Sequence, residues 1–171
     1  MAWNDKEIGE ALPEKLPPLT PNAASIEADR CLFCYDAPGT HACLTHLDIP
    51  RFIAKIATGN LKGSASTIFA SNLLGATCSR VCPVQELCEG ACVLGGDCKP
   101  IPIGRRQRYA MDHAYATGNF PAVCAAPTGR KIAVIGAGPA GLSCAGELAR
   151  LEDDEVDSGS PRAMRERIGT L

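Results

Sequence analysis

The spacing of the cysteines constrains this chain more than any other feature of its sequence. The 171 residues include ten cysteines, arranged in the centre as C-x2-C-x8-C starting at Cys31 and C-x3-C-x5-C-x3-C starting at Cys78. Thiolates are soft ligands, and several of them at short spacing select zinc or an iron–sulfur cluster over hard cations such as Mg²⁺. A fold that brings the two cysteine groups together would therefore build a metal centre.

Composition and charge exclude several other classes of protein. The net charge of −2 and the aromatic content of 5% indicate neither a basic patch nor a stacking surface for nucleic acid. No apolar run reaches the roughly 18 residues that a membrane-spanning helix needs, and the N-terminus lacks the basic and apolar regions of a signal peptide. We therefore expect a cytoplasmic protein with no nucleic-acid or membrane partner. In that compartment clustered cysteines bind metal more often than they form disulfides.

The cysteine pattern favours iron–sulfur chemistry over zinc. Zinc ribbons carry C-x2-C pairs separated by about 15–20 residues, and this chain has no such spacing and no histidine at a zinc-finger spacing. Cys82 is followed by proline, as is the last cysteine of bacterial ferredoxin motifs. A zinc-stabilised interaction module and a disulfide-linked protein are the alternatives. Four cysteines need not be ligands and are expected to be buried apolar thiols: Cys78, Cys98, Cys124 and Cys144.

Helix signals run through the first 117 residues. The sequence predicts helices over residues 22–34, 51–58, 61–74 and 104–116, with loop and short helical turns over 78–100. The first of these helices is predicted to carry three apolar side chains on or near one face: Ile26, Leu32 and Phe33. Since no segment alternates as a strand does, a mainly helical domain is expected over residues 22–117, after an extended lead-in at 1–21.

A glycine-rich turn follows a predicted linker at 118–130. Residues 132–135 are expected to form a buried strand and residues 139–150 a helix. In a dinucleotide fold the glycines of G-x-G-x-x-G allow a tight turn, close approach of the backbone to a pyrophosphate and close packing of the helix. The phosphates then lie at the helix N-terminus. The candidate cofactor-binding residues are Gly136, Gly138, Pro139, Ala140 and Gly141.

The unit at 131–150 lacks the rest of a nucleotide-binding domain. Asp157 lies where an acidic residue would hold the ribose, but no apolar strand precedes it in the charged segment 151–171. We therefore expect a truncated Rossmann-type β-α unit, the first strand-turn-helix of an FAD-binding domain, followed by an unrelated or disordered tail. The alternative is a partner chain that supplies the missing half.

Several motifs together resemble one protein family. They are Arg30-Cys-Leu-Phe-Cys-Tyr-Asp-Ala-Pro38, Asn72-Leu-Leu-Gly-Ala-Thr-Cys-Ser-Arg-Val-Cys-Pro83, Leu87-Cys-Glu-Gly-Ala-Cys92 and Pro100-Ile-Pro-Ile-Gly-Arg-Arg-Gln107. Over residues 24–150 the chain is similar to the N-terminal iron–sulfur domain of dihydropyrimidine dehydrogenases and of the glutamate synthase small subunit. The resemblance implies a helical two-cluster ferredoxin-like domain that binds [4Fe-4S], followed in full-length relatives by an FAD domain and an NAD(P)H domain.

The same resemblance implies the cluster ligands. One cluster would be held by four cysteines that are all present: Cys43, Cys82, Cys88 and Cys92. The other would use Cys31, Cys34 and Gln107 together with a cysteine at the position that Gly39 occupies here. Glycine has no ligand atom, so this second cluster would have an open iron, take a substitute ligand or not form.

The resemblance also implies a function. In this family electrons pass from NAD(P)H to FAD and through the clusters to a catalytic partner subunit that reduces a pyrimidine or forms glutamate. For this chain we expect the iron–sulfur electron-transfer part of an oxidoreductase of dihydropyrimidine dehydrogenase type, with vestigial flavin binding and no catalysis by the truncated chain alone. A glutamate synthase small subunit-like protein and a non-catalytic cluster carrier are the alternatives.

Overall fold

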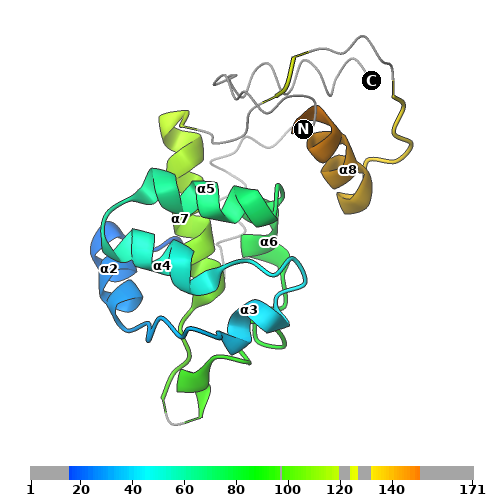
Figure 1. Ribbon diagram of the computed structural model, residues 1–171. Helices are drawn as coiled ribbons and strands as arrows, with labels where there is room; N and C mark the ends of the chain where they lie inside the picture. Colours follow the sequence, from blue (N-terminus) through cyan, green and yellow to red (C-terminus); the bar gives the residue numbers. More distant parts are fainter. Residues whose placement is uncertain (1–15, 97, 120–123, 127–131, 151–171) are drawn as a thin grey trace, which may run out of the picture.

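The computed structural model describes residues 16–96, 98–119, 124–126 and 132–150. Within these ranges the secondary structure is helical and no strand is formed, as expected for a mainly helical domain (Figure 1). The elements are α2 (Pro21–Asp29), α3 (Pro38–Ala42), α4 (Ile49–Ala57), α5 (Leu61–Ser71), α6 (Gly75–Val81), the 3-10 turn η1 (Val93–Gly95), α7 (Ile103–Thr117) and α8 (Pro139–Arg150).

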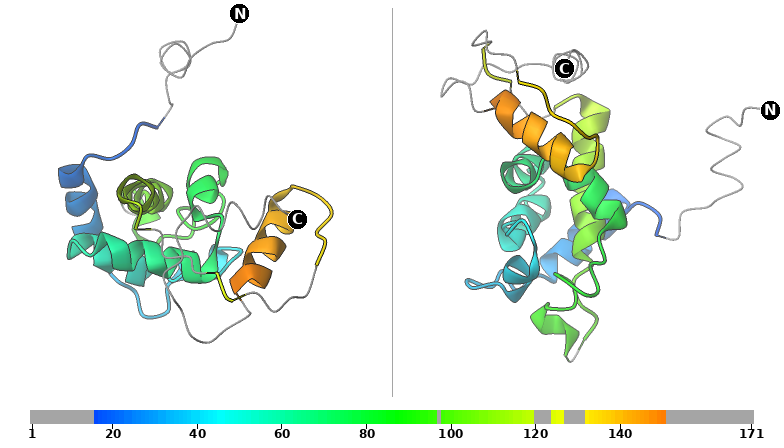
Figure 2. Two further views of the ribbon diagram at one scale, coloured as in Figure 1. Left: turned by 90° about the horizontal axis from the view of Figure 1, so that it is seen from above. Right: turned by 90° about the vertical axis from the view of Figure 1, so that its right-hand side faces the viewer.

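The long helix α7 is the centre of the helical domain. It contacts α2, α4, α5 and α6, and the left view of Figure 2 looks almost along its axis, with α2, α5 and α6 around it. Side chains from these helices form one hydrophobic core, whose members include Ala28, Phe52, Ile53, Ile68 and Met111. The core therefore fixes α2 and α6, the helices that precede the two cysteine groups, on one common support.

Local capping chemistry explains where several of the helices begin or end. The Asp48 side chain accepts a hydrogen bond from the Arg51 amide at 3.1 Å, and the Asn60 side chain accepts one from the Gly63 amide at 2.8 Å. Such caps satisfy backbone donors that a helix start leaves free. At the other end, Gly118 adopts a φ of 67° after the last residue of α7, a left-handed conformation that glycine tolerates best.

The first helix differs from the sequence prediction. α2 is capped by the Thr20 hydroxyl and ends at Asp29, short of the predicted end at residue 34. It buries its alanines, whereas Ile26 is 65% exposed and Leu32 and Phe33 follow the helix as exposed residues. The predicted common face was therefore wrong: Leu32 and Phe33 lie beyond the helix, Ala24 and Ala28 make its buried contacts, and Ile26 lies on the opposite side of the helix from them.

Two short helices were not predicted. α3 begins at Pro38, between the helices predicted over 22–34 and 51–58, and α6 begins at Gly75, directly after the helix predicted over 61–74. A Cβ atom at Gly75 would collide with the Ile68 side chain, so α6 starts where the backbone packs directly on α5. Helices this short depend on tertiary contacts more than on local propensity, and periodicity in the sequence does not predict them.

The expected buried strand at 132–135 was wrong. These residues form no strand, and Ile135 is 98% exposed. A strand obtains its hydrogen bonds from a neighbouring strand, and the described residues provide no such neighbour. The helix after it was predicted correctly as Pro139–Arg150, and Arg150 donates a hydrogen bond to the Phe69 carbonyl of α5 at 3.3 Å.

Several predicted segments lie wholly or partly outside the described residues. The tail at 151–171 with Asp157 and most of the lead-in at 1–21 lie outside, and so does most of the linker at 118–130. Among the helices that are described, none is both long enough and apolar enough to span a bilayer.

Candidate metal centre

Two of the predicted ligands follow directly after short helices. Cys43 is the residue after α3, and Cys82 is the residue after α6. Both have an extended ψ, 125° for Cys43 and 134° for Cys82, so the chain leaves the helix at each cysteine. The missed helices α3 and α6 are thus the elements that place these two thiols.

The thiols of Cys43, Cys82 and Cys88 lie close enough to influence one another. The pKa of the Cys88 thiol is raised to about 12, mainly by burial and in addition by the nearby groups Glu89, Cys43 and Cys82. Burial also raises the pKa of Cys82, with additional contributions from Cys78 and Cys43. The structure therefore brings together three of the four predicted cluster ligands.

The raised pKa values of Cys82 and Cys88 fit a site that binds a cationic group. Each thiol must lose its proton to become a ligand, and for Cys82 and Cys88 burial together with neighbouring thiolates disfavours that loss in the free protein. Iron would offset the negative charge that makes these two thiolates unfavourable. Cys82 and Cys88, with Cys43 beside them, are thus a donor set that matches an iron–sulfur cluster in chemistry.

Other predicted ligands lie around a single apolar pocket, called the inner pocket below. Cys31, Cys34, Cys88 and Cys92 all border it, and so does Gly39. The remaining lining comes from apolar and proline residues of the 32–53 and 93–103 segments. Cys88 thus belongs both to this pocket and to the group with Cys43 and Cys82. Within the described residues no three His, Cys, Asp or Glu side chains are arranged to hold one single metal ion.

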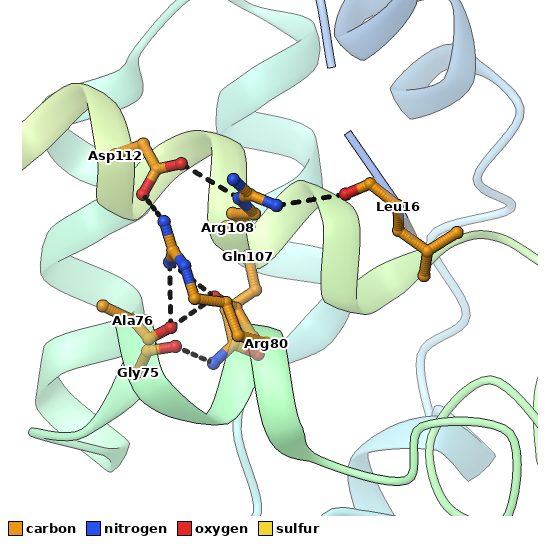
Figure 3. Close-up of polar contacts among 8 residues, drawn as sticks. Leu16, Gly75, Ala76, Arg80, Gln107, Arg108 and Asp112 are labelled. Carbon is orange, nitrogen blue, oxygen red and sulfur yellow. Dashed lines mark hydrogen bonds and ion pairs between the residues drawn. The ribbon is translucent and has the colours of Figure 1, made fainter. Parts of the chain in front are cut away.

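Gln107 does not join the cysteines of the inner pocket. It is buried on α7 and its Nε2 donates to the Gly75 carbonyl oxygen at 2.7 Å (Figure 3). Asp112, farther along α7, pairs with Arg80 of α6 at 2.6 Å. Gln107 therefore ties α7 to α6, and it is absent from the lining of the pocket that contains Cys31 and Cys34.

Gly39 fills the position at which the resemblance implies a further ligand. Gly39 is buried in α3, and a Cβ atom added to it would lie 3.0 Å from the Cys88 carbonyl oxygen and 3.4 Å from Ile49 Cδ1. The distance to the Cys88 carbonyl oxygen is tight for a real side chain, whereas the distance to Ile49 is an ordinary contact. The local packing around Gly39 is therefore adapted to the absence of a side chain.

A buried charge network next to the inner pocket was missed by the sequence analysis. The Arg106 side chain is 0% exposed, and its Nη2 donates to Glu27 Oε2 of α2 at 3.0 Å. Glu89, beside Cys88, accepts a hydrogen bond from the Gly104 amide at 3.0 Å at the start of α7. Burial raises the pKa of Glu89, and Gly104 and Arg106 partly counteract this effect. Nothing in the sequence around the adjacent Arg105 and Arg106 indicates that one of them is buried.

The backbone of the glycine-rich turn shares several features with a nucleotide-binding turn. Gly136 has a φ of 110°, and a Cβ on Gly141 would collide with the Gly136 carbonyl oxygen. A Cβ on Gly138 would meet nothing within 4 Å, which leaves the backbone there accessible. Pro139 and Ala140 form the first turn of α8.

The four cysteines that were expected to be buried apolar thiols differ in their exposure. Cys98 and Cys144 are exposed, which contradicts the expectation that they are buried thiols, and Cys78 and Cys124 are half-buried. Cys144 lies on α8, next to the buried residues Ala145 and Gly146 but itself exposed.

Comparison with known proteins places this geometry in context. The profile of the family described as "Dihydropyrimidine dehydrogenase domain II, 4Fe-4S cluster" matches residues 10–119. The chain is 47% identical over 131 residues to the NAD-dependent dihydropyrimidine dehydrogenase subunit PreT of Escherichia coli O157:H7, covering 77% of this chain and 32% of that protein. It is 44% identical over 143 residues to the PreT homolog of Salmonella typhi, covering 84% and 35%.

A second group of relatives carries a different name. The chain is 35% identical over 158 residues to the glutamate synthase [NADPH] small chain of Halomonas elongata, covering 84% of this chain and 34% of that protein. The chain thus spans about a third of the length of the curated relatives that it matches.

Proposed function

Because the chain belongs to the dihydropyrimidine dehydrogenase domain II family of 4Fe-4S proteins, we propose that it is the electron-transfer part of an NAD(P)H-dependent flavoprotein oxidoreductase. A [4Fe-4S] cluster supplies one-electron transfer at a potential that the surrounding protein sets. The observation that carries the proposal is the proximity of Cys43, Cys82 and Cys88 inside a family match that covers most of the helical domain.

The proposed cluster ligands are Cys43, Cys82, Cys88 and Cys92. Cys43 and Cys82 are positioned by the ends of α3 and α6, and Cys88 and Cys92 by the turn between α6 and η1. Leu44 and Val81, which adjoin Cys43 and Cys82, are largely exposed. A centre held there would lie near the surface, where a partner subunit could approach closely enough to exchange electrons.

The flavin half of the proposal rests on the turn at 136–141. Gly136, Gly138, Pro139, Ala140 and Gly141 would contribute the phosphate-binding start of an FAD domain, with the N-terminus of α8 directed at the pyrophosphate. Open space at Gly138 supports this role. In the complete arrangement electrons would pass from NAD(P)H through FAD to the cluster and on to a catalytic partner subunit.

A dihydropyrimidine dehydrogenase-type role is proposed over a glutamate synthase role. The support is the higher identity to the PreT subunits, 47% against 35% for the glutamate synthase small chain. The proposed division of the chain is a helical cluster domain at 22–117, a linker at 118–130, the start of an FAD domain at 131–150 and a separate tail.

Anaerobic reconstitution of the full chain with iron and sulfide tests the proposal. We expect about four irons and four sulfides per chain and a broad absorbance near 400 nm. Cys82→Ser should lose most of this absorbance, whereas Cys144→Ser should keep it because that thiol is exposed on α8. FAD-supported reduction of a dye by NAD(P)H would test the flavin half separately.

The outcome that contradicts the proposal is a colourless protein with stoichiometric zinc. Zinc bound by four thiolates would indicate a structural site and hence an interaction module. Equal loss of iron in Cys82→Ser and Cys144→Ser would contradict the proposed ligand set, because it would show that iron binding depends on overall thiol number and not on position.

A further inference from the structure

We propose that the buried guanidinium of Arg106 raises the reduction potential of an iron–sulfur centre that borders the inner pocket, and that Glu27 limits this effect. The inference rests on the proposed electron-transfer function and names the two side chains that tune it. It starts from the place of Arg106 in the fold, from its incomplete hydrogen bonding and from the carboxylate that it shares with a second arginine.

Arg106 lies close to the inner pocket. Ile103 forms part of the pocket wall, and Arg106 follows it one turn later on the same side of α7. Both residues are buried, and the Arg106 side chain has no exposed surface. Four cysteines border the same pocket: Cys31, Cys34, Cys88 and Cys92. Since Cys88 and Cys92 are proposed cluster ligands, the centre that they help to hold has this buried cation in its surroundings.

The charge of Arg106 acts on groups at two places along the pocket. Burial raises the pKa of the Cys31 thiol, Cys92 raises it further, and Arg106 lowers it. Burial also raises the pKa of Glu89, which follows Cys88 in the chain, and Arg106 counteracts this change as well. The guanidinium therefore stabilises negative charge both at Cys31 and next to Cys88.

The hydrogen bonds of Arg106 leave its charge only partly compensated. Nη2 donates to Glu27 Oε2 at 3.0 Å and Nη1 donates to the Pro102 carbonyl oxygen at 2.8 Å, whereas Nε is buried without a partner among the described residues. The same Glu27 oxygen also pairs with Arg30 at 2.6 Å. Because two guanidinium groups share one carboxylate, this group of three side chains carries a net positive charge.

A net positive charge beside an iron–sulfur centre favours the reduced state. Reduction adds one electron to the centre and so makes its charge more negative by one unit; the electron comes from the reduced flavin of the proposed function, or from dithionite in a titration. Arg106 stays protonated throughout. At an effective dielectric constant of about 20, two unit charges about 10 Å apart change an equilibrium constant by roughly tenfold.

A dye-mediated redox titration of the reconstituted full chain with dithionite tests the proposal. Arg106→Met should lower the equilibrium constant for reduction about tenfold, which is a midpoint about 59 mV lower for one electron. Glu27→Gln removes the opposing charge and should raise the midpoint above that of the wild type. The double variant Glu27→Gln/Arg106→Met should lie between the two single variants. A purely structural role would instead move both single variants in the same direction.

Two matched variants separate charge from packing. Arg106→Lys keeps the positive charge and should keep the midpoint close to that of the wild type. Glu147→Gln removes one carboxylate from the exposed pair with Arg150 on α8 and should leave the midpoint unchanged. The difference between Glu27→Gln and Arg106→Met should persist at high salt, because buried charges are screened much less than exposed ones.

Several results would overturn the proposal. One is an equal midpoint in wild type, Arg106→Met and Glu27→Gln, each with about four irons per chain; another is a shift of the same sign in both variants. If Arg106→Met does not fold, the double variant must still lie below Glu27→Gln. If about eight irons give two midpoints, at least one must follow the expected order. A wild type without iron would overturn the electron-transfer function as well, so iron content distinguishes the two failures.

Discussion

The ion pair between Glu27 of α2 and Arg106 of α7 provides a quantitative test of how the helical domain is held together. Arg106 is fully buried, and the one carboxylate within ion-pair distance of it among the described residues is that of Glu27, at 3.0 Å, while Glu89 acts on it from farther away. Arg106 Nη1 also donates to the Pro102 carbonyl at 2.8 Å, while its Nε has no hydrogen-bond partner among the described residues. Glu27→Gln would keep the shape of the side chain and leave the guanidinium charge unpaired.

The loss of stability expected for Glu27→Gln follows from the burial of Glu27 and Arg106. Removing one member of a buried ion pair costs about 3–5 kcal/mol, because the other charge stays buried without compensation. The Glu27 side chain is 27% exposed and also pairs with Arg30 at 2.6 Å, so water reaches part of the site. We therefore expect Glu27→Gln to lower the free energy of unfolding by about 2–3 kcal/mol.

A urea titration followed by far-ultraviolet circular dichroism measures this change. The double variant Glu27→Gln/Arg106→Met should recover most of the loss, because two neutral side chains replace the pair. The control Glu147→Gln removes the exposed partner of Arg150 on α8 and should change stability by less than about 0.5 kcal/mol. If Glu27→Gln is as mild as this control, the reasoning from buried charge is wrong.

Three further predictions concern the same domain. Gln107→Leu should destabilise the protein by about 1–3 kcal/mol, because the Gly75 carbonyl loses its donor, yet iron content should stay unchanged; loss of half the iron would contradict this. Although burial opposes them, the charges and hydrogen bonds of Arg30 and Arg106 hold the pKa of Glu27 below its ordinary value of 4.5. Its stabilisation should be complete above that pH and be lost as pH falls through the lower folded value, so in acid titrations the wild type should lose more stability than Glu27→Gln. Gly118→Ala should cost about 1 kcal/mol at the φ of 67°, measured by the midpoint of thermal unfolding; an unchanged midpoint would contradict it.

The helices that could be predicted from the sequence are those with strong local signals. Asp48 before a proline, Asn60 after a glycine, and Gly118 after a long amphipathic stretch each mark a helix boundary through an interaction within a few residues. The inward face of α2 could not be predicted in this way. Its contacts are made by alanines that fit against other helices, and the identity of those neighbours is a property of the tertiary fold.

The candidate site also has a part that the sequence predicted and a part that it did not. Spacing alone identified the kind of donor and the two groups of cysteines, because short intervals between thiols are local information. It did not identify that Cys88 borders the pocket of Cys31 and Cys34, or that Gln107 bonds to Gly75. Those contacts join residues that are far apart in the chain, and α3 and α6, which set them, are too short to be recognised by periodicity.

The central position of α7 has a consequence for how the protein would retain metal. α2 and α6 both pack on this helix, and each leads into one of the cysteine groups, so opening of either contact would move one group away from the other. Metal release and exposure of the α7 amides to solvent would then share the same transient opening. The lifetime of the bound metal and the slowest amide hydrogen exchange in α7 should accordingly change in parallel when Glu27 is substituted.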